Sequence, residues 1–117
     1  MHKLAVLSSI IIACIFSVGV KSEECNIAGV WEHSAKPATL FIDLTKGEIS
    51  VHSHDLNPKS IGLVVLKSIK LSSTTSSWDA KMYSATVDTF VDVLITSKSC
   101  NQLSVGFQGD EILGLVR

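Results

Sequence analysis

Residues 38–54 read ATLFIDLTKGEISVHSH, and this stretch decides the fold class. Apolar side chains occupy alternate positions from 38 to 44, and they return at Ile49 and Val51. A period of two places such side chains on one face of an extended strand. Between the two runs, Gly47 stands where a tight turn requires a positive φ angle. The stretch therefore predicts a β-hairpin.

The same alternation continues along the chain. Alternate positions from 87 to 95 and from 103 to 107 are mostly apolar, and residues 112–116 are almost wholly apolar. Residues 61–71 are also typical of a strand, although 66–71 fits a helical turn as well. No longer window has a helical period. Seven or eight short strands joined by tight turns predict an all-β fold, either a sandwich or a small antiparallel up-and-down barrel.

Residues 1–22 are typical of a secretory signal peptide. A charged start at Lys3 precedes an almost entirely apolar run over residues 4–20, and polar sequence follows. This pattern predicts cleavage before Glu23, with cleavage after Gly19 as an alternative. A membrane anchor is a second interpretation, but the run is shorter than the roughly 20 apolar residues that a spanning helix needs. A lipoprotein modified at Cys14 is a third, although the apolar run continues past that cysteine.

Cleavage would leave residues 23–117 as one domain, because no repeat or linker divides them. Loss of Lys3 and Lys21 leaves eight basic side chains against eleven acidic ones, a net charge near −3. A mildly acidic domain without a cluster of Lys and Arg argues against nucleic acid or anionic lipid as a partner. We therefore expect a secreted protein, extracellular or periplasmic, with no stable membrane insertion after cleavage.

Two cysteines, Cys25 and Cys100, would remain after the signal peptide is removed. An even pair in an oxidising compartment predicts a disulfide, and the alternative is two free thiols. The link would span 75 residues, and a closure of that size stabilises the folded state by roughly 4 to 5 kcal/mol. A barrel accommodates it well, because the first and last strands of a barrel are neighbours.

Short motifs in the mature sequence resemble those of lipocalins and other calycin barrels. The match is closer to an uncharacterised family of small exported proteins, mostly bacterial, with a lipocalin-like barrel. The matching segments are Gly29-Val30-Trp31, Asn57-Pro58, Gly62-Leu63-Val64-Val65-Leu66, Trp78, Met82-Tyr83, Leu103-Ser104-Val105 and Arg117. The chain departs from the family pattern at Ala80-Lys81, Ser84-Ala85 and Leu115, which replace Gly-rich dipeptides and a Trp.

The resemblance implies a barrel closed at one end by Gly29, Trp31 and Arg117. In such barrels the guanidinium packs on the indole face, a contact that is favourable by about 0.5 to 2 kcal/mol. Two further side chains are candidates for lining a ligand cavity. They are Trp78, which follows a run of Ser and Thr, and Tyr83, which offers a hydroxyl.

Few residues in the sequence are candidates for metal binding or catalysis. His52 and His54 lie two apart, so on a regular strand they share a face and, with His33, form a candidate zinc site. The alternative leaves both in solvent, and we expect no metal or other cofactor. Asp88 and Asp92 also share a face, either as an acid–base pair or as solvated side chains. Because no nucleophile motif or phosphate-binding glycine loop is present, we predict that the protein is not an enzyme.

Two functions remain. The first is a binding module for a small apolar or amphipathic ligand, which cannot be large because an eight-stranded barrel is only just wide enough for its own side chains. The second is a filled barrel that contacts another extracellular protein. Three apolar side chains that point outward in the predicted register, Phe41, Phe90 and Leu94, would form that surface.

Overall fold

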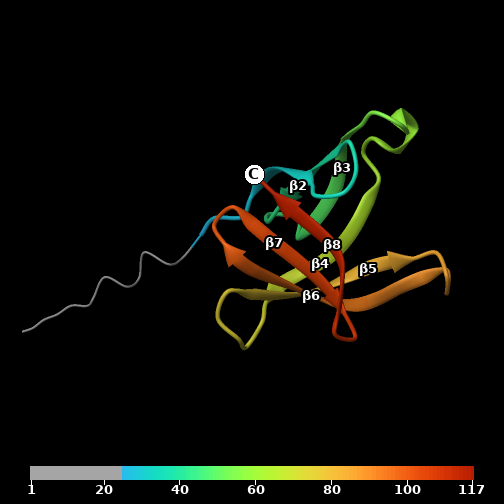
Figure 1. Ribbon diagram of the computed structural model, residues 1–117. Coiled ribbons are helices and arrows are strands. Elements are labelled where there is room, and N and C mark those ends of the chain that lie inside the picture. The colour runs from blue at the N-terminus through green and yellow to red at the C-terminus, as the bar shows by residue number, and fades with distance from the viewer. Residues whose placement is uncertain (1–24) are drawn as a thin grey trace, which may run out of the picture.

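The computed structural model describes residues 25–117, which form a closed barrel of eight antiparallel strands (Figure 1). The strands are β1 (Gly29–His33), β2 (Ala38–Asp43), β3 (Glu48–His54), β4 (Val64–Leu71), β5 (Ser77–Ser84), β6 (Thr89–Ser99), β7 (Gln102–Phe107) and β8 (Asp110–Val116). Each strand pairs with its neighbour in sequence, and β1 pairs with β8 to close the barrel. The all-β, up-and-down barrel is confirmed. The predicted signal peptide lies outside the described residues.

The hairpin predicted at residues 38–54 is formed by β2 and β3. Gly47 has a φ angle of 67° in its turn. The Gly47 carbonyl accepts a hydrogen bond of 3.0 Å from the backbone N–H of Ile69, and a Cβ on Gly47 would lie 3.3 Å from the Ile69 oxygen. This turn therefore favours glycine for its backbone conformation and for its close contact with β4.

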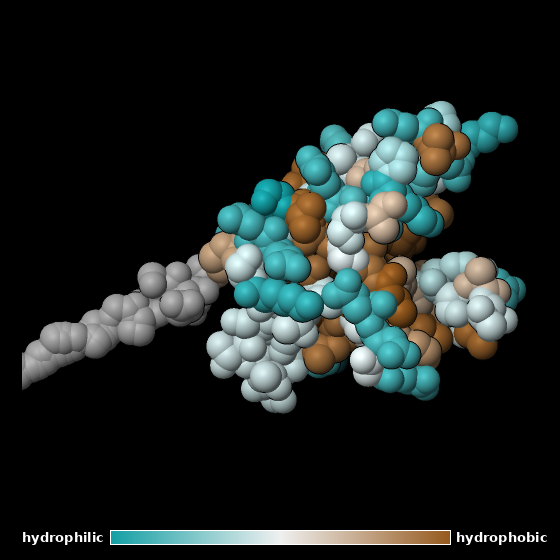
Figure 2. Space-filling view, in the orientation of Figure 1, coloured by the Kyte–Doolittle hydropathy of each residue, from teal (hydrophilic) through white to brown (hydrophobic). Residues whose placement is uncertain are grey.

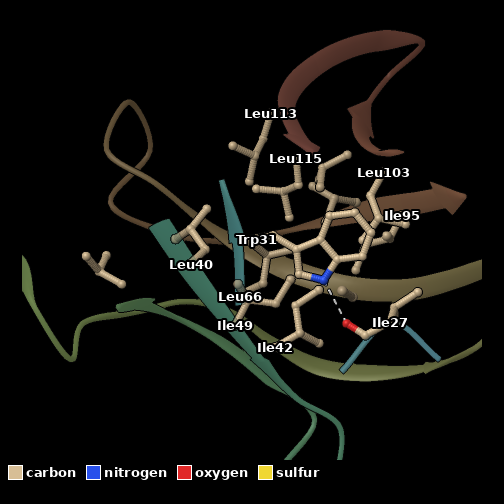
Figure 3. Close-up of a cluster of buried hydrophobic side chains, with 14 residues drawn as sticks. Ile27, Trp31, Leu40, Ile42, Ile49, Leu66, Ile95, Leu103, Leu113 and Leu115 are labelled. Atoms are coloured by element: carbon tan, nitrogen blue, oxygen red, sulfur yellow. Dashed lines mark hydrogen bonds between the residues drawn. The ribbon is translucent and has the colours of Figure 1, made fainter. Parts of the chain in front are cut away.

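Inward-facing side chains fill the barrel around Trp31, which is completely buried (Figure 3). The indole Nε1 donates a hydrogen bond of 2.9 Å to the carbonyl of Ile27. The rest of this core consists of Leu40, Ile42, Ile49, Val51, Leu66, Ala80, Val93, Ile95, Leu103, Val105, Leu113 and Leu115. Within residues 25–117 every buried side-chain nitrogen or oxygen has a hydrogen-bond partner. The interior is thus a packed apolar core.

The up-and-down order sends alternate connections to opposite ends of the barrel. One end, which we call the disulfide end, carries Cys25, the β2–β3, β4–β5 and β6–β7 connections and the C-terminus. The other, the hairpin end, carries the β5–β6 connection and the 3-10 helix η3 (Pro58–Ser60). In Figure 1 the disulfide end lies to the left and the tip of the β5–β6 hairpin to the right.

Two strands start later than their sequence patterns predict. The strand expected from residue 61 starts at Val64, because η3 and a turn occupy residues 58–63, and residues 66–71 are strand with no helical turn. The strand expected from residue 87 starts at Thr89, because residues 85–88 form the β5–β6 turn. Asp88 ends that turn with a φ angle of 52°, a left-handed conformation that Asp adopts more readily than most residues.

Candidate functional site

A pocket of about 580 Å³ opens at the disulfide end of the barrel. Small-molecule sites have volumes of roughly 300 to 1,000 Å³, so this one is large enough for a ligand. Its lining combines apolar side chains with a loop of hydroxyl residues. The lining residues are Cys25, Ile27, Leu44, Leu71, residues 72–76, Trp78 and Ser97. Trp78, a ligand-lining candidate from the sequence, is therefore part of it.

Strand pairing places Trp78 in the wall of the pocket. It lies opposite Ile95 of β6, which is fully buried, so its side chain points to the inner face of the barrel. On the other side it pairs with Leu71, the last residue of β4, which is 77% exposed. Trp78 packs against the core at its edge, so its side chain can also line the pocket that opens there.

The rim of the pocket is the serine and threonine loop, residues 72–76, pale at the lower left of Figure 2. Backbone hydrogen bonds fix its two ends, from Ser72 N–H to the Ser77 carbonyl at 3.1 Å and from Ser97 N–H to the Ser76 carbonyl at 2.9 Å. The buried Ser77 hydroxyl donates to the Thr74 carbonyl at 2.9 Å. These hydrogen bonds hold the exposed loop in place.

Four rim hydroxyls, those of Ser73, Thr74, Thr75 and Ser76, form no hydrogen bond with any other group in residues 25–117. The Ser72 hydroxyl differs, because it accepts a hydrogen bond of 3.3 Å from the backbone of Thr74. A hydroxyl can both donate and accept. The rim therefore offers neutral hydrogen-bonding groups to a bound molecule.

The predicted disulfide between Cys25 and Cys100 is present, with Cα atoms 5.3 Å apart. It fastens the segment before β1 to the β6–β7 connection, beside Ile27 in the pocket wall. A disulfide is consistent with an oxidising compartment.

Arg117 holds the same region together from the other end of the chain. Its Nε donates to the Cys100 carbonyl at 3.0 Å, and its Nη2 donates to the Asn26 carbonyl at 2.9 Å. Its Cζ lies 4.1 Å from the ring centroid of Trp31. Gly29 begins β1 with a φ angle of 115°, which strains any residue with a side chain. Two of the three residues that the resemblance assigns to barrel closure, Trp31 and Arg117, therefore contact each other at the disulfide end.

Tyr83, the second ligand-lining candidate, does not lie in this pocket. It is near the end of β5 at the hairpin end, on the outer face of the barrel, and it is 44% exposed. Its hydroxyl donates a hydrogen bond of 2.5 Å to Asp88, and its ring meets Phe90 edge to face at 5.9 Å. Strand alternation explains the difference, because residues 78 and 83 are five apart and therefore face opposite sides of the sheet.

The hydrogen bond to Asp88 raises the pKa of Tyr83 above its ordinary value, since the carboxylate favours the protonated phenol. Tyr83 is the only tyrosine in the sequence, so alkaline titration of the near-ultraviolet absorbance reports on it alone. We expect Asp88→Asn to lower the midpoint toward that of free tyrosine. Asn tolerates the left-handed backbone of position 88, which keeps the turn intact. An unchanged midpoint would show that this bond has no effect in solution.

The histidines do not form the zinc site considered from the sequence. A register shift pairs Val51 with Leu40 and Ser53 with Thr39, so His52 is an extra, exposed residue in a β-bulge. His54 then pairs with Ala38 on the inner face. The expectation that His52 and His54 share a face is therefore wrong. No group of three or more His, Cys, Asp or Glu side chains in residues 25–117 could hold a metal ion.

The rings of His33 and His54 each accept a hydrogen bond from nearby backbone. His54 Nδ1 accepts a hydrogen bond from Leu56 N–H at 3.2 Å, and His33 Nδ1 accepts one from Ala35 N–H at 3.0 Å. Partial burial lowers the pKa of His33, and the positive charges of Lys36 and His54 lower it further. These contacts shape the β1–β2 and β3–β4 connections at the hairpin end.

The two aspartates are also separated. Asp88 lies in the β5–β6 turn with Tyr83, whereas Asp92 on β6 pairs with Lys81 at 2.6 Å. The hydrogen bond and charge of Lys81 lower the pKa of Asp92. Each carboxylate therefore has its own partner, and the two do not form an acid–base pair.

The outward apolar residues do not form a single patch. Phe41 on β2 and Leu94 on β6 are 38% and 41% exposed, so both face outward as predicted. β2 and β6, however, lie on opposite sides of a closed eight-stranded barrel. Phe90 is half-buried beneath Lys67, whose Nζ lies 4.0 Å from the ring centroid. One surface that uses all three residues is therefore ruled out.

Within residues 25–117 no helix has the length and apolarity needed to cross a membrane. Comparison of the chain with protein-family models, curated proteins and solved structures finds no match. Functional interpretation therefore depends on the chemistry of the site itself.

Proposed function

We propose that the protein is exported and that it binds a small apolar or amphipathic ligand in the pocket at the disulfide end. The observation that carries this proposal is the pocket of about 580 Å³ with Ile27, Leu71 and Trp78 in its walls. Apolar walls with a few convergent polar groups are typical of small-molecule sites. The proposal involves no reaction, no cofactor and no nucleic acid.

This site differs in position from the barrel interior, where the lipocalin resemblance suggests a ligand. Trp31 and the surrounding aliphatic side chains fill that interior. Ile27 separates the two regions, since its side chain belongs to the core while it also lines the pocket. The ligand would therefore lie at the disulfide end, against the Ser/Thr rim.

Export is supported by the signal-like sequence of residues 1–22 and by the disulfide. Structural disulfides persist in extracellular and periplasmic proteins and are rare in the cytosol. In this proposal the disulfide also has a local role, because Cys25 is itself a lining residue.

A neutral naphthylamine dye, which fluoresces in apolar surroundings, tests the proposal on the purified exported protein. We expect a saturable rise in fluorescence that Trp78→Ala weakens about tenfold, because the substitution removes a large apolar contact surface from the site. Circular dichroism would verify that the variant retains its fold.

The matched control is Tyr83→Ala, which removes the other candidate aromatic side chain at the opposite end of the barrel. This variant should bind the dye with unchanged affinity. Absence of saturable binding, or equal losses in the two variants, would overturn the proposed site.

A further inference from the structure

The pocket at the disulfide end has an uncharged lining. Its side chains are aliphatic, aromatic or hydroxylic, and its one cysteine is in a disulfide and does not titrate. No Asp, Glu, His, Lys or Arg is among the lining residues of the described chain. Because an ion that leaves water needs an opposite charge or several hydrogen bonds, the composition of the lining constrains the ligand.

Several charged residues lie close in sequence to the lining without being part of it. Lys70 lies directly opposite Asp79 in the β4–β5 pairing. Lys98, next to Ser97, is 3.6 Å from Glu111. Lys46 lies in the β2–β3 turn, where its backbone N–H donates to Asp43. None of these side chains lines the pocket.

We infer that the ligand carries an uncharged polar group, such as an alcohol, ester or amide, on an apolar body. The apolar part contacts Trp78 and Leu71, and the polar group meets the hydroxyls of residues 73–76, which have no other partner in the described chain. A neutral head keeps its hydrogen bonds on this rim, whereas a carboxylate or ammonium loses water without gaining a counter-charge. This inference rests on the proposed function.

Three ligands with the same ten-carbon chain allow the effect of the head group on affinity to be compared. They are decanol, decanoate and decyltrimethylammonium, measured at pH 8 by displacement of the naphthylamine dye. Decanoate is ionised at this pH, since carboxylic acids titrate near pH 4. The cationic ligand is included because Glu23 and Glu24 directly precede Cys25 in the sequence. We expect decanol to bind about tenfold more tightly than either ion.

A charge introduced at the rim provides the matched variant. Thr75→Lys removes one rim hydroxyl and adds a positive charge, so we expect it to raise decanoate affinity relative to decanol affinity about threefold, the scale of an exposed ion pair. Thr86→Lys adds the same charge to the exposed β5–β6 turn at the hairpin end and should change neither ligand. An effect at Thr75 that Thr86 does not reproduce places the head group at the rim.

The outcomes separate the two proposals. If decanoate or the cation displaces the dye as well as decanol does, the inference of an uncharged ligand is overturned while the binding site stands. If Thr75→Lys and Thr86→Lys act alike on decanoate, the head group is not at the rim, and the inference fails in the same way. If the dye itself does not bind saturably, the proposed function fails first.

Discussion

Replacing Trp31 with alanine is expected to lower the free energy of unfolding by about 3 to 5 kcal/mol. The indole is completely buried at the centre of the core. Its loss removes a large apolar surface, leaves the Ile27 carbonyl without its 2.9 Å hydrogen bond and removes the ring on which Arg117 rests. Since small domains are stable by only about 5 to 15 kcal/mol, this is a large fraction of the total.

Urea unfolding monitored by circular dichroism measures the effect. Trp31→Phe provides a variant that retains a ring beneath Arg117 but loses the donor to Ile27, and we expect it to cost about 1 to 3 kcal/mol. The control is Trp78→Ala, which truncates the same residue type at a half-buried position in the pocket mouth. If Trp78→Ala destabilises the protein as much as Trp31→Ala does, Trp31 is not the centre of the core.

Removing the disulfide by the double substitution Cys25→Ser and Cys100→Ser is expected to cost about 4 kcal/mol of stability. The bond joins residues 75 apart in sequence, and a long closed loop strongly restricts the unfolded chain. Chemical unfolding of the double variant beside the oxidised protein measures the loss. A loss below about 1 kcal/mol would show that other contacts already restrict the chain ends.

Arg117 would compensate for loss of the disulfide, because its side chain donates hydrogen bonds to the carbonyls of both Cys100 and Asn26. We therefore expect Arg117→Met to destabilise the double variant more than the oxidised protein. In the oxidised protein the disulfide still holds Cys25 beside Cys100. Additive losses would instead mean that the two links act independently.

The same double variant also tests whether the disulfide shapes the pocket. Cys25 and Ile27 form part of the pocket wall, so release of this segment should weaken binding of the naphthylamine dye even at temperatures where the barrel stays folded. The binding measurement therefore distinguishes a disulfide that only stabilises the fold from one that also shapes the pocket.

Much of the fold follows directly from the sequence. Alternation in residues 38–54, with Gly47 at the turn, predicts the β2–β3 hairpin, and the structure has it. The even pair of cysteines that signal cleavage would leave predicts the disulfide that is present. The hairpin is predictable because a period of two in the local sequence defines one face of a strand. The disulfide is predictable because two cysteines allow only one pairing. The Gly-x-Trp motif at Gly29 also coincides with an unusual backbone conformation that glycine accommodates.

The positions of the functional candidates depended on longer-range pairing. One extra residue in β3 places His52 and His54 on different faces, because a bulge reverses the alternation that follows it. Nothing in the local sequence distinguishes this bulge from a regular strand. Similarly, Trp78 and Tyr83 are only five residues apart, yet one lines the pocket and the other lies outside the opposite end.

The sequence by itself determined that the chain forms short strands with one apolar face and that two distant cysteines pair, because these properties depend on side-chain type and spacing alone. Only the tertiary structure decided that Trp31 fills the interior and that a pocket, uncharged in its described lining, forms beside it from residues 25–27, the β4–β5 loop and the end of β6. The physical reason is that barrel closure brings segments distant in sequence to one end, and the pocket exists only where those segments meet.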